Sequence, residues 1–232
     1  MATQQMAIAN IERVDIITEE AAPAVYSFDT ASNAQAEAQI SAGAESELRI
    51  KNQILAQNIT EDIVKGFNIT LTDSVFSPDV FALVDGGESS FDANDRFSSY
   101  SAPTAGEVVG RMKCTMAVYA AEKDYSGKCV SYTAFIFPHA SGAPASVSLK
   151  DGEFYAPSYT MKSRPSKGQS PMTVISLPSL PVIVSSAADI PASPVAGKTA
   201  LLIASGSVSS DVGFSASPGD YAVYSSEGWI KL

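Results

Sequence analysis

The chain has 232 residues, of which 45% are hydrophobic and 17% are charged, and its formal net charge is −10. This length suits one good-sized domain, alone or with a small appendage, and it can bury a core without disulfides or metal ions. The negative charge argues against stable binding to nucleic acid, whose phosphates it repels.

The N-terminal part of the chain predicts two short strands and a connection. Residues 7–18 and 25–28 carry loosely alternating or β-branched side chains that favour strands. Residues 32–44 consist of Ala, Ser, Gln, Glu and Gly with a single Ile. This composition indicates a mobile connection, or a weak helix over residues 33–40.

The next segment predicts a strand, a second strand and a helix. Residues 47–58 alternate and favour a strand, although the apolar spacing over residues 53–64 also permits a helix. Residues 66–73 alternate cleanly and predict a half-buried strand. Residues 78–85 predict a short helix, because Ser-Pro-Asp is a start signal and Gly86-Gly87 is a stop signal.

Residues 88–106 are polar and rich in turn residues, and they predict a long loop. The loop carries three aromatic side chains, Phe91, Phe97 and Tyr100. These side chains either pin the loop to its own domain or dock onto a neighbouring subunit. The sequence leaves both possibilities open.

The middle of the chain predicts a β-hairpin followed by further strands. Residues 108–120 and 128–137 alternate and are joined by a Lys-Asp-Tyr-Ser-Gly turn. Residues 138–142 contain Pro and Gly and are expected to end the hairpin. Further strands are expected at residues 145–150, 153–163 and 173–177.

The C-terminal part predicts a separate small module. Residues 178–194 contain four prolines around a short apolar stretch, which indicates a linker. Residues 185–232 are rich in Gly and Ser and predict a small all-β module with Trp229 as its main core residue. The chain is therefore expected to divide into residues 1–180 and this module.

Residues that could carry chemistry are few. His139 is the single histidine, and Cys114 and Cys129 are too few for a disulfide framework, so we expect reduced thiols. The sequence contains no phosphate-binding loop, no nucleophile elbow and no zinc-ligand spacing. We expect no catalytic residue, cofactor or metal. We also expect no secretory signal and no membrane span.

Charge is unevenly distributed along the chain. Residues 1–95 hold 16 acidic and 4 basic side chains, whereas residues 96–180 hold 5 acidic and 9 basic ones. The acidity either aids solubility or lets the first segment meet the basic one, within or between subunits. In the second case the candidate assembly residues are the cations of the middle segment together with the three loop aromatics. The cations are Arg111, Lys113, Lys162 and Arg164, which are expected on strands.

Three stretches carry a family resemblance. They are LRIKNQILA at residues 48–56, GFNITLTDSVFSPDVFALVDGG at residues 66–87 and GEFYAPSYTMKSRP at residues 152–165. In their order and spacing, they resemble the major tail tube proteins of long-tailed bacteriophages. The resemblance covers roughly residues 40–177.

The resemblance implies a fold and an assembly. The implied fold is a mainly β, tail-tube-type β-sandwich or barrel with one flanking short α-helix, which residues 78–85 match, and with extended hairpins. Six copies would form a ring, and rings would stack into the virion tail tube after assembly in the host bacterial cytoplasm. The C-terminal module is expected on the outer surface.

The resemblance also implies partners. They are other copies of the chain and tail proteins such as the tape measure, tail tip or baseplate, and terminator proteins. DNA would pass through the lumen without specific binding, and no membrane is involved. Two rival classes remain: another phage virion or surface structural protein, such as a decoration protein or adhesin, and an enzyme with an unrecognised site.

Overall fold

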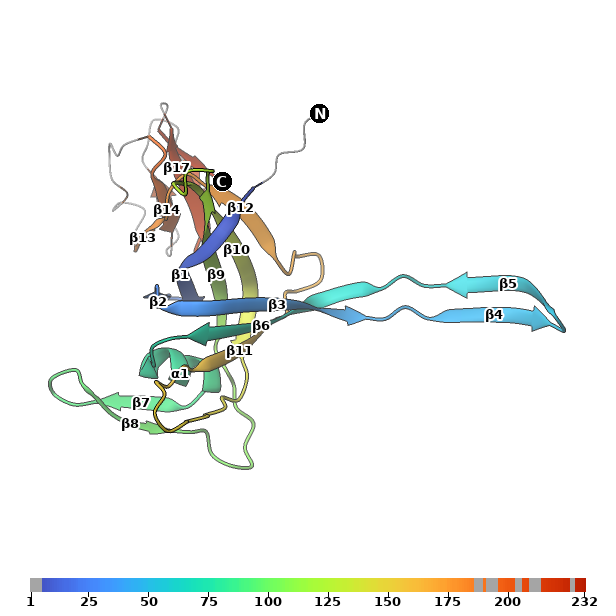
Figure 1. The fold of residues 1–232 in the computed structure, drawn as a ribbon, viewed down its shortest axis with the longest axis horizontal. Helices are drawn as coiled ribbons and strands as arrows, with labels where there is room; N and C mark the ends of the chain where they lie inside the picture. Colours follow the sequence, from blue (N-terminus) through green and yellow to red (C-terminus); the bar gives the residue numbers. More distant parts are fainter. Residues whose placement is uncertain (1–5, 186–189, 191–195, 203–205, 209–213, 226–227) are drawn as a thin grey trace.

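The structure is a computed structural model of the chain. It describes residues 6–185, 190, 196–202, 206–208, 214–225 and 228–232 (Figure 1). The fold is mainly β, as the sequence predicts, and the described residues contain one short α-helix.

The main sheet has eight strands, in the order β2-β1-β9-β10-β11-β6-β3, with β12 also paired to β10. Neighbouring strands are antiparallel throughout. The predicted strands at the N-terminus and the predicted central hairpin are confirmed as β1, β2 and the β9–β10 pair. The strand bounds are β1 (Ile8–Thr18), β2 (Val25–Phe28), β3 (Ala31–Ser41), β6 (Ile63–Asp73), β9 (Lys113–Lys123), β10 (Cys129–Gly142), β11 (Ser158–Ser163) and β12 (Thr173–Leu177).

Strand β10 changes partner partway along its length. Residues 132–136 pair with β12, whereas residues 140–142 pair with β11. Pro138 and His139 lie between these two sections, at an irregularity in the pairing with β9, and His139 has φ of 49°. Proline fits this interruption because it has no amide hydrogen to donate to a ladder. The expectation that residues 138–142 end the strand is therefore wrong.

The helix α1 (Pro78–Asp85) lies where the sequence predicts it and packs against β10 and β11. Gly86 ends it in the left-handed conformation, with φ of 83°, and its amide donates to the Ala82 carbonyl at 2.8 Å. The Ser77 side chain makes no capping hydrogen bond within the described residues, so Ser77 acts through its extended backbone only. The main core cluster joins α1 to the sheet and includes Val14, Ile16, Ile69, Leu71, Val80, Val84, Met116 and Met161.

Residues 32–44 form strand β3 for most of their length, and neither a connection nor a helix. Strand β3 pairs with β6 in a register that sets Ala34, Ala36 and Ala38 opposite Leu71, Ile69 and Phe67. Alanine has a low β-propensity, so the strand is made by its pairing with β6 and not by local preference. Strand β3 lies at an edge of the main sheet.

Residues 47–58 form a hairpin and neither one strand nor a helix. Its strands are β4 (Glu45–Ile50) and β5 (Gln53–Ile59), and Lys51 in the turn has φ of 54°. We call residues 45–59 the arm. Strand β3 leads into the arm and β6 leads out of it, and the arm projects far from the rest of the molecule (Figure 1).

The segment predicted as a long loop contains a second hairpin, formed by β7 (Glu88–Phe91) and β8 (Phe97–Ser101). The strand expected at residues 145–150 is not formed, and the following strand begins only at Ser158. Strand β9 likewise begins at Lys113 and not at residue 108. Residues 143–157 instead run beside α1 without regular structure.

The C-terminal module contains a four-stranded sheet in the order β13-β14-β17-β18 and the separate pair β15–β16. Trp229 is buried with Val184, Ala200, Leu202 and Ala222, which confirms it as a core residue of the module. The bounds are β13 (Val182–Val184), β14 (Thr199–Leu202), β15 (Gly206–Val208), β16 (Phe214–Ala216), β17 (Asp220–Ser225) and β18 (Gly228–Lys231).

The module shares a core with the main sheet. Leu201 and Tyr221 pack with Tyr119 and Leu177 in one buried cluster. The hydroxyls of Tyr119 and Tyr221 are hydrogen-bonded at 2.8 Å. Arg13 adds a further link, since its guanidinium donates to the Pro181 carbonyl at 2.8 Å. The two parts therefore stabilise each other.

Candidate assembly surface

The arm exposes apolar side chains on both of its faces. Every residue of β4 and β5 is exposed. Directly paired residues of an antiparallel ladder share a face. Leu48 therefore lies on one face, opposite Ala56, while Ile54 and Ile59 lie on the other face, opposite Arg49 and Glu45.

This exposure is energetically unfavourable for an isolated chain. Leu48 and Leu55 are each 58% exposed, and Ile54 is 51% exposed. Complete burial of such a side chain is worth about 1.5–3 kcal/mol. A two-stranded hairpin alone in water is only marginally stable. Both faces of the arm therefore suit contact with another protein surface.

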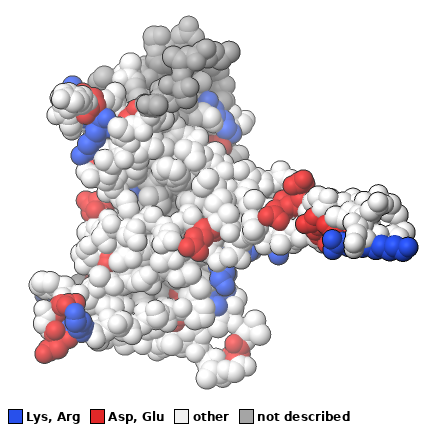
Figure 2. Space-filling model, turned by 45° about the vertical axis from the view of Figure 1, so that its right-hand side comes forward, with Lys and Arg blue, Asp and Glu red and all other residues white. Residues whose placement is uncertain are grey.

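Charge divides the arm into two parts. Its end carries Arg49 and Lys51 without an acidic side chain between residues 48 and 55, whereas Glu45 and Glu47 lie nearer its base. Figure 2 shows this arrangement, with blue side chains at the tip of the arm and red ones behind them. The end of the arm is therefore both apolar and basic.

Three of the four candidate cations lie on one face of the main sheet. The register places Lys113 and Lys162 on either side of Ser141, in one row across the strands. Arg164 follows β11 directly, and its guanidinium donates to the side-chain oxygens of Gln39 and Asn68 at 3.3 Å each. Within the described residues none of the three cations forms an ion pair.

Arg111 lies apart from the other cations. It precedes β9, so the expectation that it belongs to a strand is wrong, as it is for Arg164. Its Nε donates to the backbone carbonyl of Asp85 at 2.9 Å, at the end of α1. The Asp85 carboxylate accepts from the amide of Ala145 at 2.8 Å. Arg111 therefore joins the helix end to the segment before β9.

The three candidate aromatics divide into one anchor and two exposed rings. Tyr100 packs on Phe81 of α1, with ring centroids 4.9 Å apart, and its hydroxyl donates to the Asp85 carboxylate. Burial and this carboxylate raise the pKa of Tyr100. Phe91 and Phe97 are paired with each other across the hairpin but remain 42% and 44% exposed. Tyr100 thus pins the hairpin to its own domain, while the two Phe rings stay accessible.

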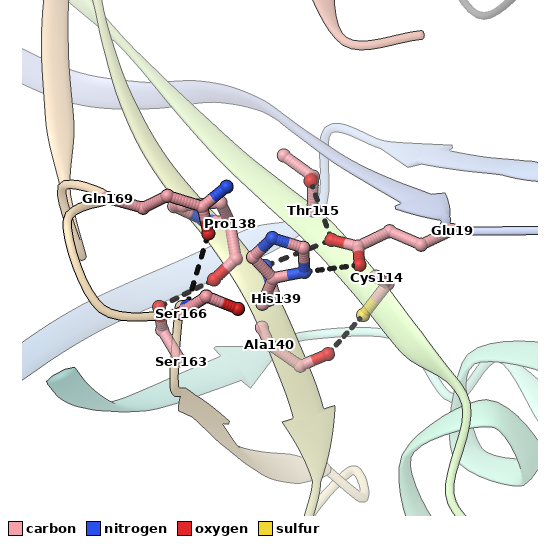
Figure 3. Close-up of polar contacts among 9 residues, drawn as sticks. All are labelled: Glu19, Cys114, Thr115, Pro138, His139, Ala140, Ser163, Ser166 and Gln169. Carbon is pink, nitrogen blue, oxygen red and sulfur yellow. Dashed lines mark hydrogen bonds and ion pairs between the residues drawn. The ribbon is translucent and has the colours of Figure 1, made fainter.

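His139 and Cys114 come close to each other without forming a nucleophile–base pair (Figure 3). His139 Nδ1 lies 2.6 Å from the Glu19 carboxylate, which also accepts from the His139 amide at 2.9 Å. The Cys114 thiol donates instead to the Ala140 carbonyl at 3.2 Å. Burial, and then the charge of Glu19, raise the pKa of Cys114 to about 12. A nucleophilic cysteine needs a lowered pKa, so this arrangement does not activate the thiol.

The described residues contain neither a cluster of metal ligands nor a membrane-spanning helix. Nowhere in this part of the chain do three His, Cys, Asp or Glu side chains gather as ligands for a metal ion. Its helix is not long and apolar enough to cross a membrane.

The two cysteines are free and lie at the two ends of the β9–β10 ladder. Cys114 pairs with Ala140, and Cys129 pairs with Lys123.

The exposure of both faces of the arm was not predicted from the sequence. A usable signal was present, because residues 45–59 have apolar side chains at both odd and even positions. A half-buried strand alternates, whereas a strand with apolar residues on both faces is covered on both faces. Within the described residues β4 and β5 pair only with each other and all of their residues are exposed, so a covering surface has to come from elsewhere.

Comparison with known proteins identifies no family for this chain. No family model matches the chain, and no curated protein matches it. Among solved structures, one similar chain belongs to the cryo-EM structure of the anti-feeding prophage baseplate. The match has 13% identity and a TM-score of 0.36, and covers 75% of this chain and 97% of that one. Likeness at this level assigns neither a fold nor a function.

Proposed function

We infer that this chain is a structural virion protein of a long-tailed bacteriophage, which polymerises as stacked hexameric rings into the tail tube. The observation that carries the proposal is the arm, a projecting hairpin with apolar side chains on both faces. A shape of this kind is unfavourable for a monomer and favourable for a subunit that inserts between its neighbours.

The arm also bears on the type of assembly. It projects much farther than the β7–β8 hairpin and points away from the body of its own molecule (Figure 1). Contacts between unlike surfaces are head-to-tail and generate rings or filaments, whereas a two-fold dimer uses one surface twice. A ring that stacks into a tube is one product of such contacts. The number six comes from the family resemblance.

A tail tube implies a lumen, a set of partners and a place of assembly. The lumen would conduct DNA without binding it, which suits a chain of net charge −10. The partners would be further copies and tail proteins such as the tape measure, tail tip or baseplate, and terminator proteins. Assembly would take place in the host cytoplasm, and the product would reside in the virion tail. The chain would have no enzymatic activity and no cofactor.

Negative-stain electron microscopy of the purified full-length chain, with sedimentation velocity over a range of concentrations, tests this function. We expect rings or tubes with a central channel. A species that stays monomeric at high concentration, including after addition of tail initiator proteins, would refute self-assembly. Ordered assemblies without a channel would favour the decoration-protein or adhesin alternative.

A further inference from the structure

A second apolar surface lies near α1, at the end of the molecule that carries the β7–β8 hairpin. It is a hollow of about 340 Å³, lined by Phe76, Phe81, Tyr100, Val147, Leu149 and Tyr155. We call it the hollow. A cavity of about 150 Å³ already accepts a molecule of benzene, so the hollow has room for more than one aliphatic side chain.

The hollow is open to solvent at its edge. Val147 is 61% exposed and Leu149 is 73% exposed, both on the segment that runs beside α1. Phe154 of the same segment is fully exposed, and Phe97 of the β7–β8 hairpin is 44% exposed. Edge-to-face packing of Phe76 with Phe97 connects the hairpin to the lining of the hollow. The hollow and the exposed side chains of its lining form an apolar surface of the kind that marks interaction sites.

The segments around the hollow are acidic. Residues 88–107, which include the β7–β8 hairpin, carry four acidic side chains and one basic one. Residues 143–157 carry two acidic side chains and one basic one. Lys150–Glu153 is the one ion pair recorded within the two segments, both of which are fully described, and the Asp92 carboxylate accepts from the amides of Asn94 and Arg96 in the hairpin turn. The two segments that border the hollow therefore each carry a net negative charge.

We propose that the hollow receives the end of the arm from a second copy of the chain; this inference rests on the proposed self-assembly. The end of the arm offers Leu48, Ile54 and Leu55 for the hollow and the cations Arg49 and Lys51 for its acidic surroundings. Apolar contact supplies affinity, and complementary charge selects the partner and orients it.

The contact must be made between copies. The eleven residues from Ser41 to Lys51 extend about 33 Å at the rise of a β-strand. The arm points to the right in Figure 1, whereas the β7–β8 hairpin and α1 lie on the lower left, so one copy cannot place its arm in its own hollow. Each copy is therefore both a donor of an arm and an acceptor of one.

Donor and acceptor variants separate this contact from assembly in general. The donor-deficient variant replaces residues 45–59 by Asn-Gly between Ala44 and Thr60, which are already hydrogen-bonded across the base at 2.9 Å. The acceptor-deficient variant is Val147→Lys with Leu149→Lys, which places positive charge where the basic arm would dock. The matched control is Tyr125→Lys with Val130→Lys, at two other exposed positions in the β9–β10 hairpin.

Sedimentation velocity of each variant, and of an equimolar mixture, gives the result. We expect the donor-deficient and acceptor-deficient variants each to stay monomeric, and their mixture to form a one-to-one heterodimer that grows no further. The control should assemble as the unmodified chain does. Heterodimer formation would also show that both variants are folded.

Three outcomes would contradict the inference. If the acceptor-deficient variant assembles normally, the hollow is not the docking site, although the proposed function stands. If the control is as defective as the acceptor-deficient variant, the effect is not specific to the hollow. If the unmodified chain does not assemble at all, the proposed function itself is refuted.

A milder substitution tests the charge component. Arg49→Gln with Lys51→Gln keeps the apolar residues of the arm and removes its two cations. Loss of one or two exposed charge contacts should raise the critical concentration for assembly about tenfold, the equivalent of about 1.4 kcal/mol. The unmodified chain should show a rise in the same direction with increasing salt, and the variant a weaker one. Equal salt dependence in both would exclude the charge pairing.

Discussion

The arm and the β9–β10 hairpin are both antiparallel pairs of strands, and they differ in how far the rest of the molecule buries them. Both are antiparallel pairs in which one strand follows the other after a short turn. In β9 the residues from Met116 to Ala121 are all buried, whereas every residue of β4 and β5 is exposed. The difference shows that the register of a hairpin can be specified locally while its stability has to come from a covering surface.

Removal of the arm should have the largest effect on assembly and little effect on the fold. In the variant that joins Ala44 to Thr60 by Asn-Gly, no buried side chain is lost, because the deleted residues are exposed. We expect assembly to be abolished, while the free energy of unfolding of the monomer changes by about 1 kcal/mol or less. Electron microscopy and urea denaturation measure the two quantities. A large loss of monomer stability would mean that the arm packs on its own chain.

Truncation of one side chain in each hairpin compares how much the two hairpins contribute to the stability of the monomer. Met116 is fully buried in the main core, so Met116→Ala should lower the free energy of unfolding by about 2–5 kcal/mol. Leu48→Ala in the arm should leave it unchanged within about 0.5 kcal/mol. Both values come from urea denaturation below the concentration at which the chain assembles. Similar losses at the two positions would remove the distinction between the hairpins.

A smaller loss in the free energy of unfolding is expected for a substitution where the β9–β10 hairpin contacts the C-terminal module. Tyr119→Phe leaves the buried hydroxyl of Tyr221 without its partner at 2.8 Å, which should cost about 1–3 kcal/mol. Adding Tyr221→Phe removes both polar groups and should recover part of that loss. Chemical denaturation of the two variants gives the comparison. An additive loss in the double variant would show that the two hydroxyls do not act as a pair.

Thiol reactivity should distinguish the two ends of the β9–β10 hairpin without changing stability. Burial raises the pKa of Cys114 to about 12, so its thiol stays protonated up to that pH in the folded state. Cys129 is partly exposed at the other end of the ladder. Iodoacetamide at pH 8 should therefore modify Cys129 and spare Cys114, and mass spectrometry after proteolysis reads out each site. Modification of both in urea is the control for reactivity.

The same raised pKa has a consequence for stability at high pH. The unfolded thiol loses its proton near pH 9, whereas the folded one keeps it until about pH 12. Ionisation of the unfolded chain in this window favours unfolding, so the contribution of Cys114 to stability is complete below pH 9 and declines above it.

Local signals predicted the elements that local interactions determine. The helix α1 has a start signal in Pro78 and Asp79 and a stop signal in Gly86, and it forms where these signals place it. Strand β6 alternates, and its residues Ile69 and Leu71 are buried. The hairpin turn after Lys123 was visible in the same way.

Elements that depend on distant partners were missed. Strand β3 consists largely of Ala and polar residues and exists because β6 pairs with it. The turn of the arm contains neither Gly nor Pro, and Lys51 adopts φ of 54°, which is uncommon for a non-glycine residue. Pro138 was interpreted as the end of a strand, although β10 continues beyond it with a new partner.

The sequence supplied candidate residues for assembly but could not place them relative to one another. Lys113, Lys162 and Arg164 share a face, which only the register of the sheet could reveal. The hollow joins residues from α1, β8 and the segment 143–157, which are far apart in the sequence. Such a surface cannot be read from a sequence because its members have no fixed spacing.

The arm also makes the free subunit prone to aggregation. Strand β5 reads QILAQNI, a short segment without charge or proline, and its outer edge is unpaired within the described residues. Segments of this type pair edge to edge into amyloid-like stacks. On the neighbouring strand the charged residues Glu45, Glu47 and Arg49 alternate with the others, and the irregularity beside Leu48 twists the ladder. Charges and ladder irregularities of this kind act as gatekeepers against edge-to-edge pairing of the free chain.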